Sequence, residues 1–208
     1  MLDNHFIMFA KSLIPSCLAL TLGLFQVANA QLKVDIGKPE ITAMNSPEFP
    51  NVGGARRAFR PKEWFEASIE LEVKKKVDRN EIPFVEELGV DWYVAIQNPG
   101  GSGTLLLEKQ TDYINIPYNE EVMVSAYLSP TSVKLLTGKD RVLKADFKYI
   151  AAVFTIDGEE VGVASNYSVD KWWESPNLSN ETSVELLSKD QTPFRLHWWD
   201  LYAEAKSN

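Results

Sequence analysis

Residues 64–77 read WFEASIELEVKKKV and carry the clearest structural pattern in the chain. Apolar and polar side chains alternate along this stretch with a period of two residues. Successive side chains of an extended strand point to opposite faces of a sheet, whereas a helix would scatter the glutamates around its surface. We therefore predict a β-strand with one face in a core and a solvated face that carries Glu66, Ser68, Glu70, Glu72, Lys74 and Lys76.

Shorter stretches with the same alternating or extended character lie on both sides of this strand. The glycine-rich residues 98–103 and the Asp157-Gly158 pair read as hairpin turns, and the second supplies the positive φ angles of a type I′ turn. Ser129-Pro130 is a typical helix start and Gly138 a typical helix end, so we predict a helix over residues 131–137. The further predicted strands occupy residues 32–36, a short stretch from 41, 90–96, 105–116, 121–128, 145–156, 159–164 and 183–187.

These elements predict an all-β fold. Roughly eight to ten strands are joined by connections too short for the crossover helices of a parallel sheet. We expect a single elaborated antiparallel β-sandwich of the immunoglobulin-like kind, with one or two short helices, over residues 31–208. Length beyond a plain immunoglobulin domain is expected in added strands and in loops such as 43–62. The tail, residues 192–202, fits either a strand or a helix.

Residues 1–30 read as a cleaved signal peptide. Lys11 precedes an apolar run over residues 13–27, and Ala28-Asn29-Ala30 offers small residues at the two positions that a signal peptidase accepts. Cleavage after Ala30 is expected to export the chain to the periplasm or the outer cell surface. An uncleaved membrane anchor is the alternative, but the run is shorter than the roughly 20 apolar residues of a spanning helix. We expect no transmembrane segment in the mature chain.

Charge and composition exclude several function classes. The chain has 21 Lys and Arg against 29 Asp and Glu, and removal of residues 1–30 leaves the formal net charge at −8. An acidic surface repels phosphates, so nucleic acid is not expected as a partner. The only cysteine, Cys17, lies in the signal, and His197 is the one histidine of residues 31–208. We therefore predict no catalytic residues, no metal ligands and no cofactor.

Two adjacent pairs of tryptophans are the most distinctive candidates for a binding surface: Trp172 with Trp173, and Trp198 with Trp199. In a strand, each pair would place one ring in the core and expose part of the other. Exposed rings can stack on sugars or dock a protein partner, since tryptophan offers a large contact area and an N–H donor. The alternative is that the C-terminal tail folds back and covers them.

A second candidate is the local basic cluster of Arg56, Arg57 and Arg60, which Lys62 extends. In an acidic chain, such a cluster can recognise a carboxylate or an acidic neighbouring subunit. A solvated loop is the simpler interpretation.

Residues 187–202, LSKDQTPFRLHWWDLY, resemble the ending of a family of exported immunoglobulin-like, pilus-like proteins of verrucomicrobial and related bacteria. In that family, Thr-Pro-Phe and Trp-Asp-x-Tyr elements close a β-sandwich that is likened to the globular part of archaeal-type pilins. The resemblance implies a structural or adhesive surface role without catalytic residues. One departure matters: cleavage after Ala30 would remove the apolar segment with which pilins polymerise, so we do not expect a major pilin.

The function expected from these observations is that of an exported, non-enzymatic structural or adhesion/interaction protein of the cell envelope or surface, with a pilus association. Its expected partner is an envelope or surface protein or a second copy of itself, reached through strand edges or an aromatic patch. The alternative is a carbohydrate-binding module that uses exposed tryptophans as a stacking platform for a glycan.

Overall fold

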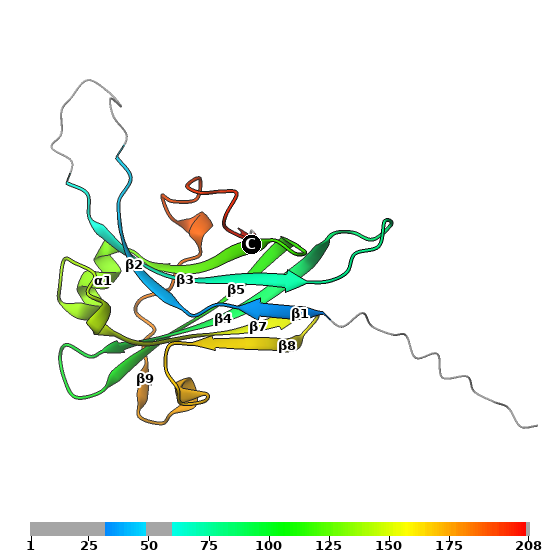
Figure 1. Cartoon of the computed structure of the whole chain (residues 1–208). Helices are drawn as coiled ribbons and strands as arrows, with labels where there is room; N and C mark the ends of the chain where they lie inside the picture. Colours follow the sequence, from blue (N-terminus) through cyan, green and yellow to red (C-terminus); the bar gives the residue numbers. More distant parts are fainter. Residues whose placement is uncertain (1–31, 49–59, 207–208) are drawn as a thin grey trace, which may run out of the picture.

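The structure is a computed structural model that describes residues 32–48 and 60–206 (Figure 1). The predicted signal, residues 1–30, lies outside the described residues. The described residues form two β-sheets that face each other, with one α-helix, α1 (Pro130–Thr137), at one end. Three short 3₁₀ helices are η1 (Lys144–Asp146), η2 (Trp172–Glu174) and η3 (Lys189–Gln191).

One sheet, called here the β3 sheet, has β3 (Glu63–Lys74) at its centre. Antiparallel β6 (Glu121–Leu128) pairs along one edge of β3, and β1 (Lys33–Ile36) and β2 (Glu40–Asn45) pair with successive parts of the same strand. The register shifts by one residue between β1 and β2, where Pro39 has no N–H to donate. The Gly37 N–H donates to the Glu70 carbonyl at 2.8 Å and keeps the two strands in line.

The other sheet, called the β4 sheet, is the larger one. Its long strands pair antiparallel and in this order along the sheet: β5 (Thr104–Pro117), β4 (Phe84–Gln97), β7 (Phe147–Ile156) and β8 (Glu159–Ser165). Two short strands, β9 (Leu178–Asn180) and β10 (Glu204–Ala205), share the outer edge of β5. The pairing of β3 with β6, and of β4 with β7 and β8, is that of an immunoglobulin-like sandwich. The predicted all-β sandwich is confirmed.

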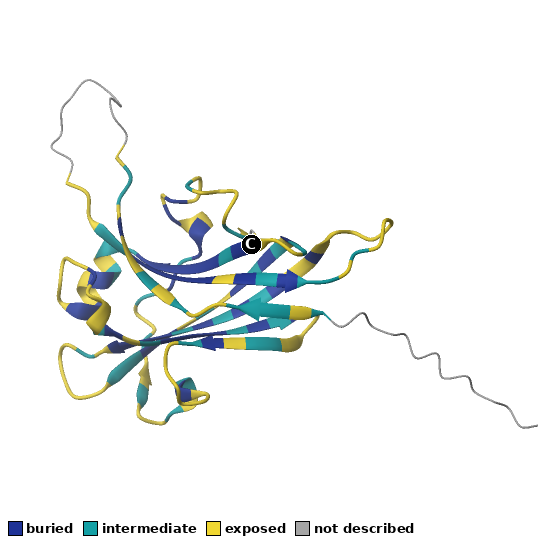
Figure 2. Ribbon diagram, viewed as in Figure 1, coloured by how far each residue is buried: buried dark blue, intermediate teal, exposed yellow. Residues whose placement is uncertain are grey.

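The core lies between the two sheets, where the buried residues of Figure 2 gather on the facing sides. Trp92 on β4 is fully buried there, which is the position of the core tryptophan in immunoglobulin domains. The rings of Phe65 and Phe147 stack across the core with 4.0 Å between their centroids. Because Cys17 is the only cysteine, hydrophobic packing alone joins the sheets at the place where antibody domains add a disulfide.

The predicted local signals are confirmed where they specify a turn or a helix end. Asp157 and Gly158 have φ angles of 53° and 78° and join β7 to β8. The hydroxyl of Ser129 caps α1 by accepting the Ser132 N–H at 3.1 Å. Gly138 ends the helix with a φ of 73°, a conformation that suits a residue without a Cβ.

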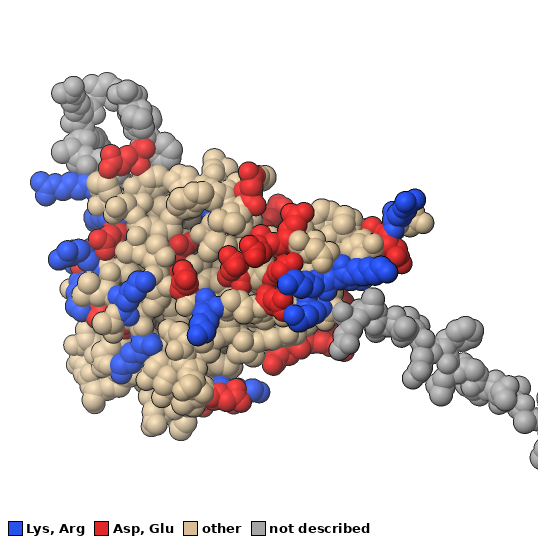
Figure 3. Space-filling model, in the orientation of Figure 1, with Lys and Arg blue, Asp and Glu red and all other residues tan. Residues whose placement is uncertain are grey.

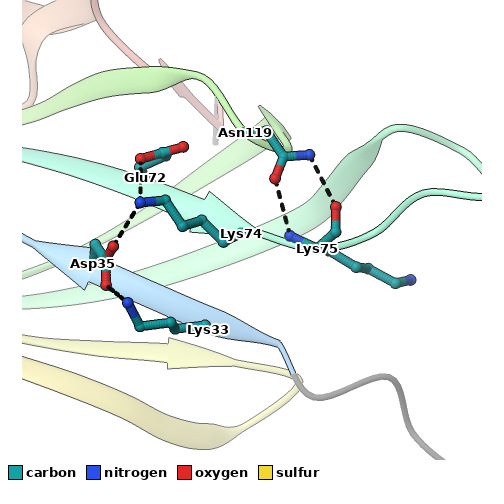
Figure 4. A network of polar contacts seen from close by, with 6 residues as sticks. All are labelled: Lys33, Asp35, Glu72, Lys74, Lys75 and Asn119. Atoms are coloured by element: carbon teal, nitrogen blue, oxygen red, sulfur yellow. Dashed lines mark hydrogen bonds and ion pairs between the residues drawn. The ribbon is translucent and has the colours of Figure 1, made fainter.

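Polar side chains fix β1 and the turn after β5 against the end of β3 (Figure 4). The ammonium group of Lys74 lies 2.8 Å from Asp35 and 2.9 Å from Glu72. Hydrogen bonding to Lys33 and then to Lys74 lowers the pKa of the Asp35 carboxyl to about 2. The Asn119 amide accepts the Lys75 N–H at 3.3 Å and donates to the Lys75 carbonyl at 2.9 Å. Just beyond the end of β3, this side chain thus makes the two hydrogen bonds that a neighbouring strand would make.

The prediction that one face of β3 is solvated is wrong at two positions. Glu70 is exposed as expected, but Glu66 and Ser68 on the same face are buried. The C-terminal part of the chain lies over them, and the hydroxyls of Tyr127 and Tyr202 both donate to Glu66 Oε1, at 2.6 and 2.8 Å. A buried carboxylate is tolerated here because it accepts these two hydrogen bonds.

Two predictions for the C-terminal third are also wrong or incomplete. Residues 183–187 do not form a strand; β9 forms earlier instead, and only Leu187 makes a single bridge, to Tyr127. The tail, residues 192–202, is neither a regular strand nor a helix but a run of turns. Backbone pairing with β5 and β6, which lie far away in the sequence, decides these conformations rather than local alternation.

The burial difference on β3 gives a matched test. Replacing Glu66 by Ala leaves the buried hydroxyl of Tyr127 and the half-buried hydroxyl of Tyr202 without their acceptor, so we expect a loss of about 2–3 kcal/mol in the free energy of unfolding. Replacing Glu70, on the same face of the same strand, should change it by less than about 0.5 kcal/mol. Urea unfolding of both variants measures the difference. Equal effects would contradict the buried role of Glu66.

Candidate functional site

Residues 187–206, called here the C-terminal segment, seal the outer edge of β6. Leu187 exchanges two backbone hydrogen bonds with Tyr127, at 2.8 and 2.9 Å. At the other end of β6, Met123 donates to the Leu201 carbonyl at 2.9 Å and accepts the Ala203 N–H at 2.8 Å. This edge therefore has no unpaired backbone for another strand, and edge pairing at β6 is not available as the interaction route that the sequence suggested.

Between these two contacts, a side chain takes the place of a strand. The hydroxyl of Tyr113, which reaches across from β5, accepts the Ser125 N–H at 3.1 Å and donates to the Ser125 carbonyl at 3.0 Å. Burial strongly raises the pKa of the Tyr113 phenol, so it stays protonated and keeps both roles. The segment then continues into β10, which pairs with β5, so it joins the edges of both sheets.

Phe194 anchors the C-terminal segment on the outer face of the β3 sheet. Its ring is buried against Trp64, edge to face at 5.6 Å, and against Tyr127 at 6.0 Å. The ammonium group of Lys189 donates to the His197 carbonyl at 2.5 Å and lies 4.5 Å from the centre of the Tyr202 ring. Burial lowers the pKa of Lys189. The segment thus folds back over the sheet, as one interpretation of the sequence proposed.

The chain between Phe194 and Tyr202 projects its own side chains outward. Trp198 and Trp199 are 60% and 66% exposed, and Leu196 is 68% exposed. Trp198 has a φ angle of 47°, a left-handed conformation that is rare for a bulky residue. The prediction that one ring of each pair is buried is wrong for this pair, because the two residues lie in turns and not on a strand with alternating faces.

A groove of about 530 Å³ opens beside Trp199, between the C-terminal segment and the ends of β5 and β6. Its apolar lining includes the exposed side chains of Phe84, Leu196 and Trp199. Its charged lining has five exposed carboxylates against two cations, of which Lys189 is buried. The carboxylates are those of Glu120, Glu121, Asp190, Asp200 and Glu204, and the second cation is Arg195.

The other predicted pair lies on the opposite outer face of the sandwich, against the β4 sheet. Trp172 is buried on this sheet, and its indole N–H donates to the Ser165 hydroxyl at 3.1 Å. Trp173 is half-buried and stacks on Tyr93 with 4.8 Å between the ring centroids. One ring of this pair is thus buried and the other partly exposed, as predicted, but both residues lie in η2, so an alternation of strand faces is not the reason. The structure does not bring the two pairs together.

The remaining candidates are only partly placed. Arg60 is exposed just before β3, whereas Arg56 and Arg57 lie outside the described residues. The ring of His197 packs edge to face against Phe194 and Trp198, with centroids 5.9 and 5.7 Å apart. Across residues 32–48 and 60–206, no group of three or more His, Cys, Asp and Glu side chains has the arrangement of a metal site.

Sequence reasoning missed the groove because its walls come from three separate stretches. Phe84 begins β4, Glu120 lies in the turn before β6, and Leu196 belongs to the C-terminal segment. The one usable signal was the concentration of aromatic and charged residues over 194–202, which the sequence shows directly.

Comparison with known proteins finds a matching family model and similar solved structures. The family model is named after a protein that its members resemble, and it matches residues 25–208. One of these structures is a crystal structure of a protein from Akkermansia muciniphila, with 30% sequence identity, coverage of 86% of this chain and 95% of that chain, and a TM-score of 0.77. A search of curated proteins found no match. Within the described part of the chain, no helix has the length and apolar character needed to cross a membrane.

The backbone at Trp198 makes a prediction about stability. Glycine adopts a positive φ at no steric cost, so Trp198→Gly should relieve strain that Trp199→Gly leaves in place. We expect Trp198→Gly to be more stable than Trp199→Gly by about 1 kcal/mol, as measured by urea unfolding. A lower stability of Trp198→Gly would show that its ring contributes more packing than its backbone costs.

Proposed function

The chain belongs to the family whose model matches residues 25–208, and on this premise we propose that it is an exported, non-enzymatic structural or interaction protein of the bacterial cell envelope or surface. The origin of the similar structure, Akkermansia muciniphila, agrees with the verrucomicrobial family that residues 187–202 resemble. A pilus-associated role is the finer part of this proposal. Periplasm and outer surface are both compatible with it.

The observation that carries the proposal is the exposure of Trp198, Trp199 and Leu196 on a segment that is otherwise firmly anchored. Large exposed apolar side chains that lie together are typical of interaction sites. The backbone on both sides of these side chains is fixed by the packing of Phe194 and by the pairing with β6. The segment is therefore already ordered, and binding costs little conformational entropy.

The absence of an enzymatic activity is part of the proposal. The ring of His197 packs between aromatic rings, its backbone N–H donates to the Phe194 carbonyl, and its own carbonyl accepts from the Lys189 ammonium group. The groove carboxylates lie on an open surface without a paired histidine, since His197 is the only histidine of residues 31–208. These features support binding rather than catalysis.

A carbohydrate-binding module is the second candidate. It is favoured by the exposed indole rings of the consecutive residues Trp198 and Trp199, because a flat exposed ring can stack on a sugar. Trp172 and Trp173 do not support it in the way first predicted, since one is buried and the other is already stacked on Tyr93.

The location is tested on intact cells of the native host that produce the full chain with a C-terminal epitope. We expect the tag to fractionate with the envelope or the periplasm, and proteinase added to intact cells to remove it only if the protein reaches the outer surface. Recovery of the full-length chain in the cytosol would contradict export.

The interaction surface is tested by photo-crosslinking in the same cells. A benzoylphenylalanine replaces Trp199 in one variant and Leu143, which is 44% exposed beside η1, in the control variant. We expect a discrete adduct with an envelope protein from position 199 and none from position 143. Equal adduct patterns from both positions would contradict a specific surface around Trp199.

A further inference from the structure

We propose that the groove beside Trp199 binds a cationic protein segment in which Lys or Arg side chains alternate with apolar ones. This inference rests on the proposed interaction function and names the chemistry of the partner. The groove is the one described above, between the C-terminal segment and the ends of β5 and β6.

The apolar part of the groove needs a partly apolar occupant. Phe84 comes from β4, Leu196 and Trp199 come from the C-terminal segment, and all three line the groove with exposed side chains. Two further lining residues fix this wall of the groove to the β3 sheet. The Tyr202 hydroxyl donates to Glu66, and the Ala203 N–H donates to the Met123 carbonyl. Apolar side chains of a partner would gain burial here without a rearrangement of the sandwich.

The charged part of the groove determines which sign of charge the partner must carry. Five carboxylates face two cations, and the ammonium group of Lys189 is already bound to the His197 carbonyl. Within the described residues, none of the five carboxylates forms a salt bridge with a Lys or Arg side chain. In Figure 3, acidic side chains gather around the place where Figure 1 marks the C-terminal end.

These observations favour a cationic segment over the other occupants. A neutral glycan would stack on Trp199 but would leave the excess of carboxylates without a counter-charge, whereas a Lys or Arg side chain can pair with a carboxylate and lie on the indole face. A second copy of this chain carries a formal net charge of −8 and on average repels the groove. The groove also has room for only a few side chains, which suits a short segment.

The test uses the protein recovered from the cell envelope and three synthetic hexapeptides with alternating leucine: Lys-Leu, Glu-Leu and Ser-Leu repeats. Calorimetry measures their binding, with chitotetraose as a neutral glycan probe. We expect the Lys-Leu peptide to bind at least about tenfold more tightly than the Ser-Leu peptide, and the Glu-Leu peptide not to bind. Raising the salt from about 0.05 to 0.5 M should weaken the Lys-Leu complex, because exposed charges are screened.

Matched variants locate the effect. Asp190→Asn with Asp200→Asn should weaken the Lys-Leu complex about tenfold. Glu159→Gln with Glu160→Gln removes the same charge from β8, which does not line the groove, and should leave it unchanged. Trp199→Ala should weaken binding of both the Lys-Leu and the Ser-Leu peptide.

Several results would overturn the inference. These are equal binding of the Lys-Leu and Ser-Leu peptides, equal loss in both charge variants, tight binding of chitotetraose without binding of the peptides, or self-association that Trp199→Ala abolishes. Each of them leaves the crosslinking result at position 199 as a separate test of the interaction function. Loss of that crosslink would remove the proposed function itself.

Discussion

The outer edge of β6 is the constraint on which the rest of the structure depends. An open strand edge exposes unpaired N–H and C=O groups and invites pairing with other chains. Here the backbone of Leu187, Leu201 and Ala203 and one phenol, that of Tyr113, satisfy it. To reach that edge, the C-terminal segment must cross the outer face of the β3 sheet, so it buries Glu66 and lifts Trp198 and Trp199 into solvent.

The strands and turns could be predicted from the sequence because their signals are local. The alternation over residues 64–77 involves consecutive side chains only, and Asp157-Gly158 forms a hairpin turn through the φ angles of these two residues. The burial of Glu66 could not be predicted in this way. Its cover, Tyr202, lies 136 residues further along the chain, and nothing in the strand pattern distinguishes Glu66 from the exposed Glu70.

In the candidate site too, local features could be predicted from the sequence, whereas features that depend on distant residues could not. Composition correctly drew attention to Trp198 and Trp199, but the rule that neighbouring rings face opposite ways holds only for a strand, and these residues lie in turns with a positive φ at Trp198. Phe84 and Glu120 carry no sequence signal for a site, because an exposed phenylalanine and an exposed glutamate are ordinary residues until the fold places them beside the same groove.

The sealing of β6 by residues 187–206 also orders the events of folding in time. Strands β1 to β9 all precede residue 187, so they can pair before the partners of Tyr127 and Met123 dock. During that interval β6 presents a bare edge, and contacts between distant parts of a chain form slowly. A chain whose C-terminal segment has not yet docked is therefore open to strand pairing with other chains, and a chain truncated before Leu187 would keep that open edge.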